Sequence, residues 1–256
     1  MKLLHSLRLA TALALLIPAQ AVFAEAAPAT ASVATQTPWL YENSDVPVDA
    51  SWTFGVLENG VRYAVKHNIV PAGQVSIRVR VDAGALHEED NELGFAHLME
   101  HLAFRGSEHV PDGEAKRIWQ RFGVTFGSDS NAQTTPTQTV YKLDLPNSSA
   151  ATLDESLKIL AGMVRAPNIS ESALNAERAI VQAELRESAG AGMDLGEAMR
   201  RHAFQGQRLA KRSTIGTIES LDTASAAALK EFHRRWYRPE KVVVSIAGDA
   251  DPKELE

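Results

Sequence analysis

The chain has 256 residues, of which 45% are hydrophobic and 23% charged, a composition that excludes wholesale disorder and allows a buried core. Its formal net charge of −6, with no run of lysine and arginine, argues against nucleic-acid binding. Because the sequence contains no cysteine, disulfides, thiolate metal sites and a cysteine nucleophile are excluded. Any bound metal must therefore be held by histidine and carboxylate side chains.

Residues 1–24 have the three parts of a secretory signal peptide. Lys2 and Arg8 give a basic start, an apolar stretch follows, and Val-Phe-Ala at 22–24 ends in a small residue, as cleavage sites do. A membrane anchor is disfavoured because the apolar run is shorter than the roughly 20 residues of a spanning helix, and Pro18 interrupts it. We therefore expect a cleaved export signal, a periplasmic or secreted protein without a stable membrane span, and a flexible lead-in over 25–50.

The rest of the chain, 51–256, is expected to form one domain. In chain order the patterns predict three strands (52–57, 61–67 and 74–83), two helices (94–105 and 114–122), two strands (124–130 and 137–145), four helices (151–164, 170–188, 195–204 and 223–236) and a final strand (242–247). Strands and helices do not alternate regularly. This order favours an α+β fold, with a mostly antiparallel sheet and helices packed on one face.

One predicted helix carries an unusual group of polar side chains. His97 and His101 are four residues apart, so helical geometry places both imidazoles on one face. Two such nitrogens can each bind a zinc ion at about 2.1 Å. Glu100 lies beside His101 and can accept a proton from a zinc-bound water. A single histidine in an apolar helix is usually a hydrogen-bonded core residue, but two histidines and a glutamate together favour a metal site.

A catalytic zinc usually has three protein ligands and one water, so a third ligand is expected. The helix at 170–188 offers Glu177, Glu184 and Glu187. Glu177 and Glu184 are seven residues apart and share a helix face, so one could bind the metal while the other orients a ligand histidine. Spacing alone does not choose between them, and the glutamates could also form a solvated acidic face.

Several segments together resemble the pitrilysin/insulinase family of zinc metallopeptidases, whose inverted motif His-x-x-Glu-His is followed on a later helix by Glu-x6-Glu. The matching segments are GFAHLMEHLAFRGS, SDSNAQTTPTQTVYKLDLP, NAERAIVQAELRE and FHRRWYRPEKVVVSIAGD. With the opening TFGVLENGVRYAVKHN they follow the family's order from about residue 52 to 249. The resemblance implies a fold like that of the mitochondrial processing peptidase.

The resemblance also implies a role for each polar residue of the two helices. The residues that match His97 and His101 bind one zinc ion in the family, and the residue that matches Glu100 is the general base. The family's third ligand matches Glu184, and the residue that matches Glu177 supports the site without binding the metal.

The implied function is zinc-dependent endopeptidase activity on peptides or unfolded segments in the periplasm. In the family, an edge strand that matches the segment around Asn131 and Ala132 pairs with the substrate. Family members also use a second homologous domain to complete the substrate chamber, so this chain alone is expected to bind zinc but to cleave weakly. The alternative is a non-catalytic scaffold or a peptide-binding subunit of a two-part peptidase.

Overall fold

The computed structural model describes residues 39, 41–42 and 44–255. The expected signal peptide at 1–24 and part of the lead-in lie outside the described residues. Among the residues that are described, no helix is both long and apolar enough to cross a bilayer.

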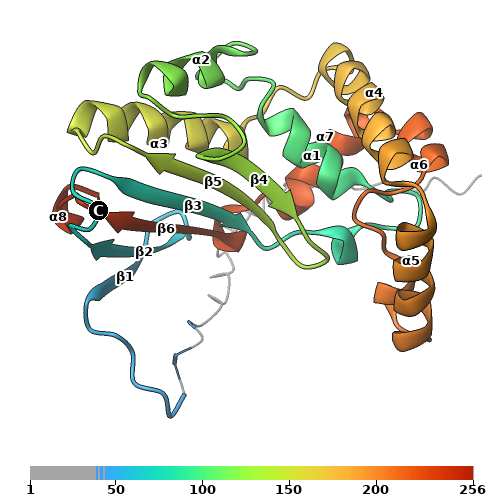
Figure 1. Ribbon diagram of the computed structural model, residues 1–256, viewed down its shortest axis with the longest axis horizontal. Coiled ribbons are helices and arrows are strands. Elements are labelled where there is room, and N and C mark those ends of the chain that lie inside the picture. Colours follow the sequence, from blue (N-terminus) through green and yellow to red (C-terminus); the bar gives the residue numbers. More distant parts are fainter. Residues whose placement is uncertain (1–38, 40, 43, 256) are drawn as a thin grey trace, which may run out of the picture. The chain divides into compact units, whose positions relative to one another are not determined.

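The centre of the fold is a six-stranded sheet whose strand order is β1-β2-β6-β3-β5-β4 (Figure 1). The strands are β1 (Trp52–Val56), β2 (Arg62–His67), β3 (Val75–Val81), β4 (Ser130–Thr134), β5 (Thr139–Leu145) and β6 (Val242–Gly248). All neighbours pair antiparallel except β2 and β6, which are parallel. The short strand β4 therefore forms one edge of the sheet.

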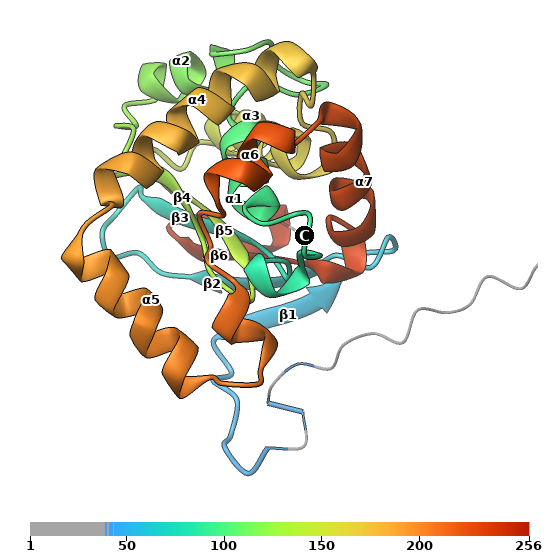
Figure 2. The same cartoon turned by 90° about the vertical axis from the view of Figure 1, so that its right-hand side faces the viewer.

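The helices gather mainly on one side of this sheet, as Figures 1 and 2 show for α1, α3, α4 and α7. Their bounds are α1 (Phe95–Ala103), α2 (Glu114–Arg121), α3 (Ala150–Arg165), α4 (Glu171–Ser188), α5 (Ala191–Ala203), α6 (Ile218–Thr223), α7 (Ala226–Trp236) and α8 (Pro252–Leu255). The predicted α+β fold with a mostly antiparallel sheet is confirmed.

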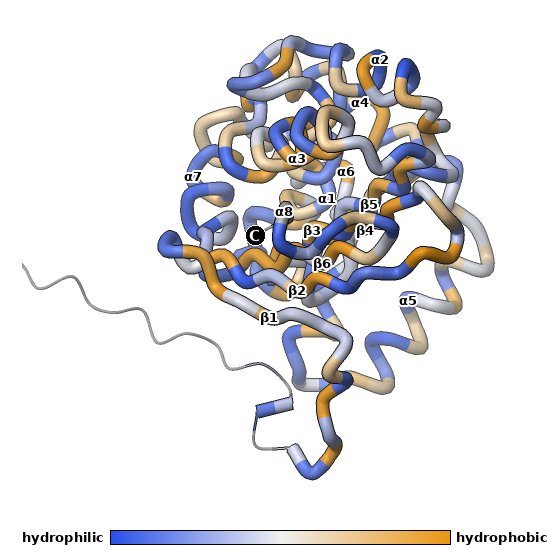
Figure 3. The backbone as a smooth tube through the Cα atoms, turned by 90° about the vertical axis from the view of Figure 1, so that its left-hand side faces the viewer, coloured by the Kyte–Doolittle hydropathy of each residue, from blue (hydrophilic) through white to orange (hydrophobic). Residues whose placement is uncertain are grey.

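The sequence alternation explains why only one face of the sheet is covered. Along β3 and β5 every second residue is buried, from Val75 to Val81 and from Thr139 to Leu145. The intervening residues are polar or half-exposed, and on that face Arg78 pairs with Asp144 at 2.7 Å. This alternation of hydrophobic and hydrophilic residues is visible along the strands in Figure 3. Helix packing on the buried face then removes its apolar surface from water.

The predicted strand at 124–130 is wrong. Residues before Ser130 form a tight turn instead, in which Gly127 has a positive φ of 98° and the Asp129 carboxylate accepts the Thr125 N–H at 2.8 Å. A glycine in this conformation and a local side-chain bond of this kind favour a turn over an extended strand. The strand β4 therefore starts at Ser130 and ends at Thr134.

Two helix predictions also need correction. The helix predicted at 223–236 is α7, which begins three residues later at Ala226 because Ser225 caps it by accepting the Ala228 N–H at 3.2 Å. The short helix α6 that precedes it was not predicted. Helix α5 begins at Ala191, four residues before the predicted start at 195. None of its residues is buried, so no apolar face marks where it begins.

Candidate metal centre

Helix α1 exposes its polar residues toward one side because its apolar residues fix its rotation. Six of its nine residues are buried, and the remaining three are His97, Glu100 and His101. These three side chains are half-buried and face α4 and β4. The apolar face therefore determines where the two imidazoles and the carboxylate point.

The first turn of α1 is stabilised from outside the helix. Its N-cap is Gly94, with a φ of 89° and no side chain to accept an N–H. The fully buried carboxylate of Glu88 instead accepts the Ala96 N–H at 2.9 Å. Burial raises the pKa of Glu88 to about 8, although hydrogen bonds from the backbone of Ala96 and Gly94 oppose that rise.

Three side chains from α1 and α4 converge on one point. The Nε2 atoms of His97 and His101 are 3.3 Å apart, and Glu184 Oε2 lies 3.7 Å from each of them. Ligands placed tetrahedrally about 2.1 Å from a zinc ion are about 3.4 Å from one another, so this triangle has the size that zinc requires. Across the described part of the chain, it is the one group of histidines and carboxylates with spacing suited to a metal ion.

Glu177 holds one of these histidines in place. Its Oε2 lies 2.8 Å from His101 Nδ1, and its Oε1 accepts a hydrogen bond from Arg105. When Nδ1 of His101 donates to a carboxylate, the lone pair of Nε2 is left for a metal. Burial alone would raise the pKa of Glu177, but the bonds from His101 and Arg105 outweigh it and keep that pKa below its usual range.

The two histidines differ in their surroundings. Burial, together with a smaller contribution from the nearby His101, lowers the pKa of His97 to about 4, so His97 stays neutral over a wide range of pH. Its Nδ1 is buried and has no hydrogen-bond partner. For His101, burial lowers the pKa, but the hydrogen bond to Glu177 and the carboxylate of Glu184 raise it above its ordinary value. Both imidazoles thus present Nε2 to the same point.

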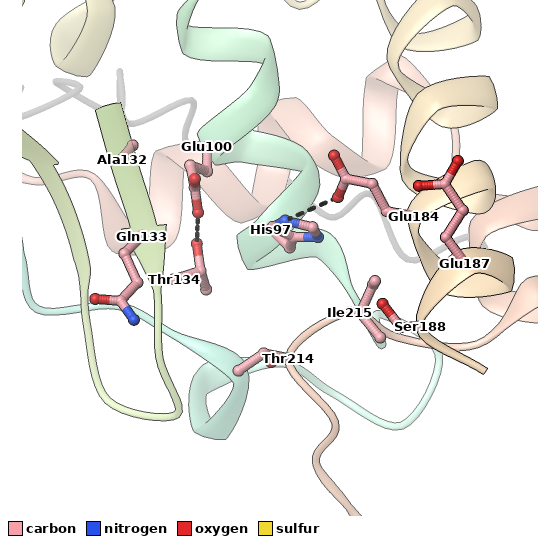
Figure 4. A pocket seen from close by; sticks show the side chains of 10 residues that line it. All are labelled: His97, Glu100, Ala132, Gln133, Thr134, Glu184, Glu187, Ser188, Thr214 and Ile215. Carbon is pink, nitrogen blue, oxygen red and sulfur yellow. Dashed lines mark hydrogen bonds and ion pairs between the residues drawn. The ribbon is translucent and has the colours of Figure 1, made fainter. Parts of the chain in front are cut away.

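Glu100 is close to the cluster without belonging to it. Burial raises its pKa, although a hydrogen bond from Thr134 opposes the rise. The Thr134 hydroxyl donates to Glu100 Oε2 at 2.5 Å. Glu100, His97 and Glu184 line a common cavity of about 530 Å³, so a water inside it could reach both the cluster and this carboxylate (Figure 4).

Strand β4 runs beside two cavities that share His97, Glu100 and Glu184. Ala132 and Thr134 line the first cavity, whereas Asn131 lines a second one of about 570 Å³. The walls of the second cavity also include Phe104, Lys116, Phe126 and Ile180. The structure thus places Asn131 and Ala132 on an edge strand next to the candidate metal centre. Glu187 lines the first cavity but stands outside the ligand cluster.

Two contacts of the site were not predicted from the sequence. Arg105 follows His101 by four residues, so helical spacing could have suggested that it lies near the same partners. Thr134 is a threonine on a strand, and no local pattern links it to Glu100. Only the packing of β4 against α1 brings the two together.

Comparison with known proteins agrees with this geometry. The sequence pattern described as insulinase, peptidase family M16, matches residues 63–218, which contain every residue of the candidate centre. The chain belongs to this family. Residues 223–256 match the pattern described as the peptidase M16 inactive domain. The resemblance to the pitrilysin/insulinase family is thereby confirmed.

Relatives within the insulinase family are much longer than this chain. The probable zinc protease PqqL of Haemophilus influenzae is 32% identical over 223 residues, which cover 87% of this chain and 24% of that protein. The crystal structure of the periplasmic protease PqqL from Escherichia coli, also 32% identical, matches with a TM-score of 0.78 over 82% of this chain and 23% of that one. Pitrilysin, at 22% identity and a TM-score of 0.69, shares the fold. The chain thus spans about a quarter of the two PqqL relatives.

Proposed function

We propose that this chain is the zinc-binding domain of a periplasmic zinc endopeptidase that hydrolyses peptides or unfolded segments. The observation that carries the proposal is the triangle of His97, His101 and Glu184, with Glu100 beside it in the same cavity. One zinc ion per chain fits this donor set, because two imidazole nitrogens and a carboxylate oxygen are typical ligands of a catalytic zinc. The domain at 51–256 would follow a cleaved signal peptide at 1–24.

The chemistry divides between the metal and the side chains. Bound zinc lowers the pKa of a water towards 7 and polarises the carbonyl of the scissile bond. Glu100 accepts the proton of the attacking water and delivers it to the leaving nitrogen. Glu177 keeps His101 oriented throughout.

The substrate is proposed to bind as an additional strand along β4. Among the described strands only β5 pairs with β4, and beyond an isolated bridge between Phe126 and Ser130 the other edge of β4 is unpaired. An extended segment could form backbone hydrogen bonds there, beside Asn131 and Ala132, and place a peptide bond near Glu100. Backbone pairing selects extended shape more than sequence, which suits peptides and unfolded segments. A second homologous domain is proposed to close the chamber, since the PqqL relatives are about four times as long.

The alternative is a non-catalytic scaffold or a peptide-binding subunit. Such a protein would need the edge strand β4 but not the metal cluster or Glu100. The presence of the two histidines, Glu184 and the adjacent Glu100 in one cavity therefore favours the peptidase.

Elemental analysis and a peptide-library digest of the full-length protein test the proposal. We expect one zinc per chain and cleavage, and Glu100→Gln should keep the zinc while lowering the cleavage rate by about 1,000-fold, within the range for loss of a general base. His97→Ala should lose the zinc itself. Cleavage by Glu100→Gln at the wild-type rate would falsify the assignment of the base. The isolated segment 25–256 should bind zinc and cleave poorly.

A further inference from the structure

We propose that Thr134 is a positioning residue that aligns Glu100 and links this alignment to substrate binding on β4. The inference rests on the proposed function and extends it to a residue outside the metal cluster. Its basis is the contact between the Thr134 hydroxyl and Glu100 Oε2, at 2.5 Å (Figure 4). A charge-assisted bond of this length is among the strong hydrogen bonds of proteins.

The hydroxyl proton of Thr134 is available to Glu100 and to no other strong acceptor. The neighbouring hydroxyl of Thr139 lies 3.4 Å from Thr134 Oγ1. Thr139 is fully buried and donates its own proton to the backbone oxygen of Ala83 at 3.0 Å. Thr134 therefore donates to the carboxylate, and Thr139 packs behind it.

The backbone that carries Thr134 is held from behind. After β4 the chain turns into β5, and this turn accepts backbone N–H groups from Ala85 at Thr135 O (3.2 Å) and from Leu86 at Pro136 O (2.8 Å). The approach is so close that a Cβ on Gly84 would lie 2.1 Å from the oxygen of Thr135. The end of β4 thus cannot move inward, and the hydroxyl is presented to Glu100 from a fixed position.

The same strand has a second role in the proposed function. Along β4 the exposed Asn131 and Gln133 alternate with the half-buried Ala132 and Thr134. The last three residues of the strand, 132–134, line the cavity of the candidate centre. A substrate that pairs with the free edge of β4 would therefore lie on the same strand whose Thr134 hydroxyl holds the carboxylate of Glu100. Without the hydroxyl, that carboxylate would keep only the smaller interaction with the Thr134 backbone and could rotate away from the attacking water. A misplacement of about 1 Å can cost a hundredfold in rate.

Steady-state kinetics of the full-length, zinc-loaded protein tests this role. Thr134→Val removes the hydroxyl and keeps the side-chain shape, and it should lower kcat by about 10- to 100-fold. KM, zinc content and the unfolding temperature should stay close to the wild type. Thr134→Ser keeps the hydroxyl and should recover kcat to within about threefold. The matched control is Thr137→Val, an exposed threonine in the following turn, which should leave kcat unchanged.

A binding measurement, which requires no turnover, distinguishes a misaligned Glu100 from a general loss of structure in the variant. A phosphinic peptide places a tetrahedral oxygen where the attacking water would sit, beside Glu100. Its affinity for Thr134→Val should fall by about the same factor as kcat, while the affinity for a phosphinate-free peptide of the same length should not change.

The outcomes are distinguishable. A wild-type protein that binds zinc but cleaves no peptide overturns the proposed function, and this inference with it. A wild-type protein that cleaves, together with Thr134→Val of undiminished kcat and inhibitor affinity, overturns the positioning role alone. An equal loss in Thr134→Ser and Thr134→Val also contradicts it, because the hydroxyl would then be irrelevant.

Discussion

The two helices that meet at the candidate centre begin in different ways. Helix α4 carries its own cap, since Ser170 accepts the Ala173 N–H at 3.2 Å. Helix α1 begins at Gly94, and its first turn depends on the buried carboxylate of Glu88, which lies on a preceding segment. The start of α4 is therefore encoded locally, whereas the start of α1 requires the tertiary fold.

The helices also differ in how they contribute ligands. In α1, His97 and His101 are juxtaposed by one turn of helix, so their spacing requires no other part of the chain. Glu184 approaches them only through the packing of α4 against α1. The metal centre therefore combines two ligands that helix spacing alone brings together, His97 and His101, with a third, Glu184, that tertiary packing brings to them. The effect of a substitution on zinc binding should therefore decline with each step away from the cluster.

Among the carboxylates around the cluster, substitution of Glu184, the ligand that α4 supplies, should have the largest effect on zinc affinity. Glu184→Gln removes the charged oxygen that lies 3.7 Å from both imidazole nitrogens, so zinc affinity should fall by more than about 100-fold, beyond the usual loss for a supporting partner. Competition with a chelator measures this affinity. Glu187→Gln is the matched control on the same helix and should bind zinc as the wild type does. A larger loss for Glu187→Gln would mean that the wrong glutamate has been assigned to the metal.

A smaller loss of zinc affinity is expected when Glu177, the carboxylate that supports His101, is substituted. Glu177→Gln keeps an oxygen that can accept from Nδ1 but loses the charge and the ion pair with Arg105. Zinc affinity should fall by about 10- to 100-fold, the range for loss of a partner that orients a ligand histidine. The same chelator competition measures it. If Glu177→Gln lost as much affinity as Glu184→Gln, the two carboxylates would have equivalent roles and the contrast between them would fail.

The sequence predicts the part of this site that lies on α1 better than the part that α4 supplies. The spacing of His97, Glu100 and His101 is a property of one helix, and the structure brings them to one face as expected. Glu177 and Glu184 share a face of α4, so spacing cannot tell which one binds metal. The packing of α4 on α1 separates them, because Glu177 meets Nδ1 of His101 and Glu184 meets the Nε2 atoms.

In the sheet, too, the features that follow from a local pattern were predicted, and those that depend on turns or tertiary contacts were not. Strands β3 and β5 were predicted within a few residues because their alternation reflects one buried face. The start of β4 was missed, since Gly127 and Asp129 form a turn inside an otherwise strand-like stretch. The contact from Thr134 to Glu100 crosses from that strand to α1, and no pattern within either segment encodes it.

Substitution of Glu88 should have the smallest effect on zinc affinity, and its main consequence should be a change in how the stability of the protein depends on pH. The pKa of its buried carboxyl is about 8 in the folded protein, against an ordinary value of 4.5 in the unfolded chain. Between these values the folded state keeps a proton that the unfolded state releases, so the stabilisation is complete below pH 4.5 and is lost as the pH rises through 8. Since one pKa unit corresponds to about 1.4 kcal/mol, the free energy of unfolding should fall by on the order of a few kcal/mol across this range.

Glu88→Gln removes this ionisation while keeping an oxygen for the Ala96 N–H. Urea unfolding of the metal-free protein at pH 5 and pH 8.5 should therefore show a weaker loss of stability in the variant than in the wild type. The control is Glu89→Gln, a substitution at the exposed neighbour, which should show the wild-type dependence of stability on pH.

Zinc affinity of Glu88→Gln should stay within about threefold of the wild type, because the substitution leaves every ligand in place. If Glu88→Gln and Glu89→Gln gave the same pH dependence, the first turn of α1 would not depend on a buried, protonated carboxyl, and the contrast with the locally capped α4 would lose its electrostatic basis.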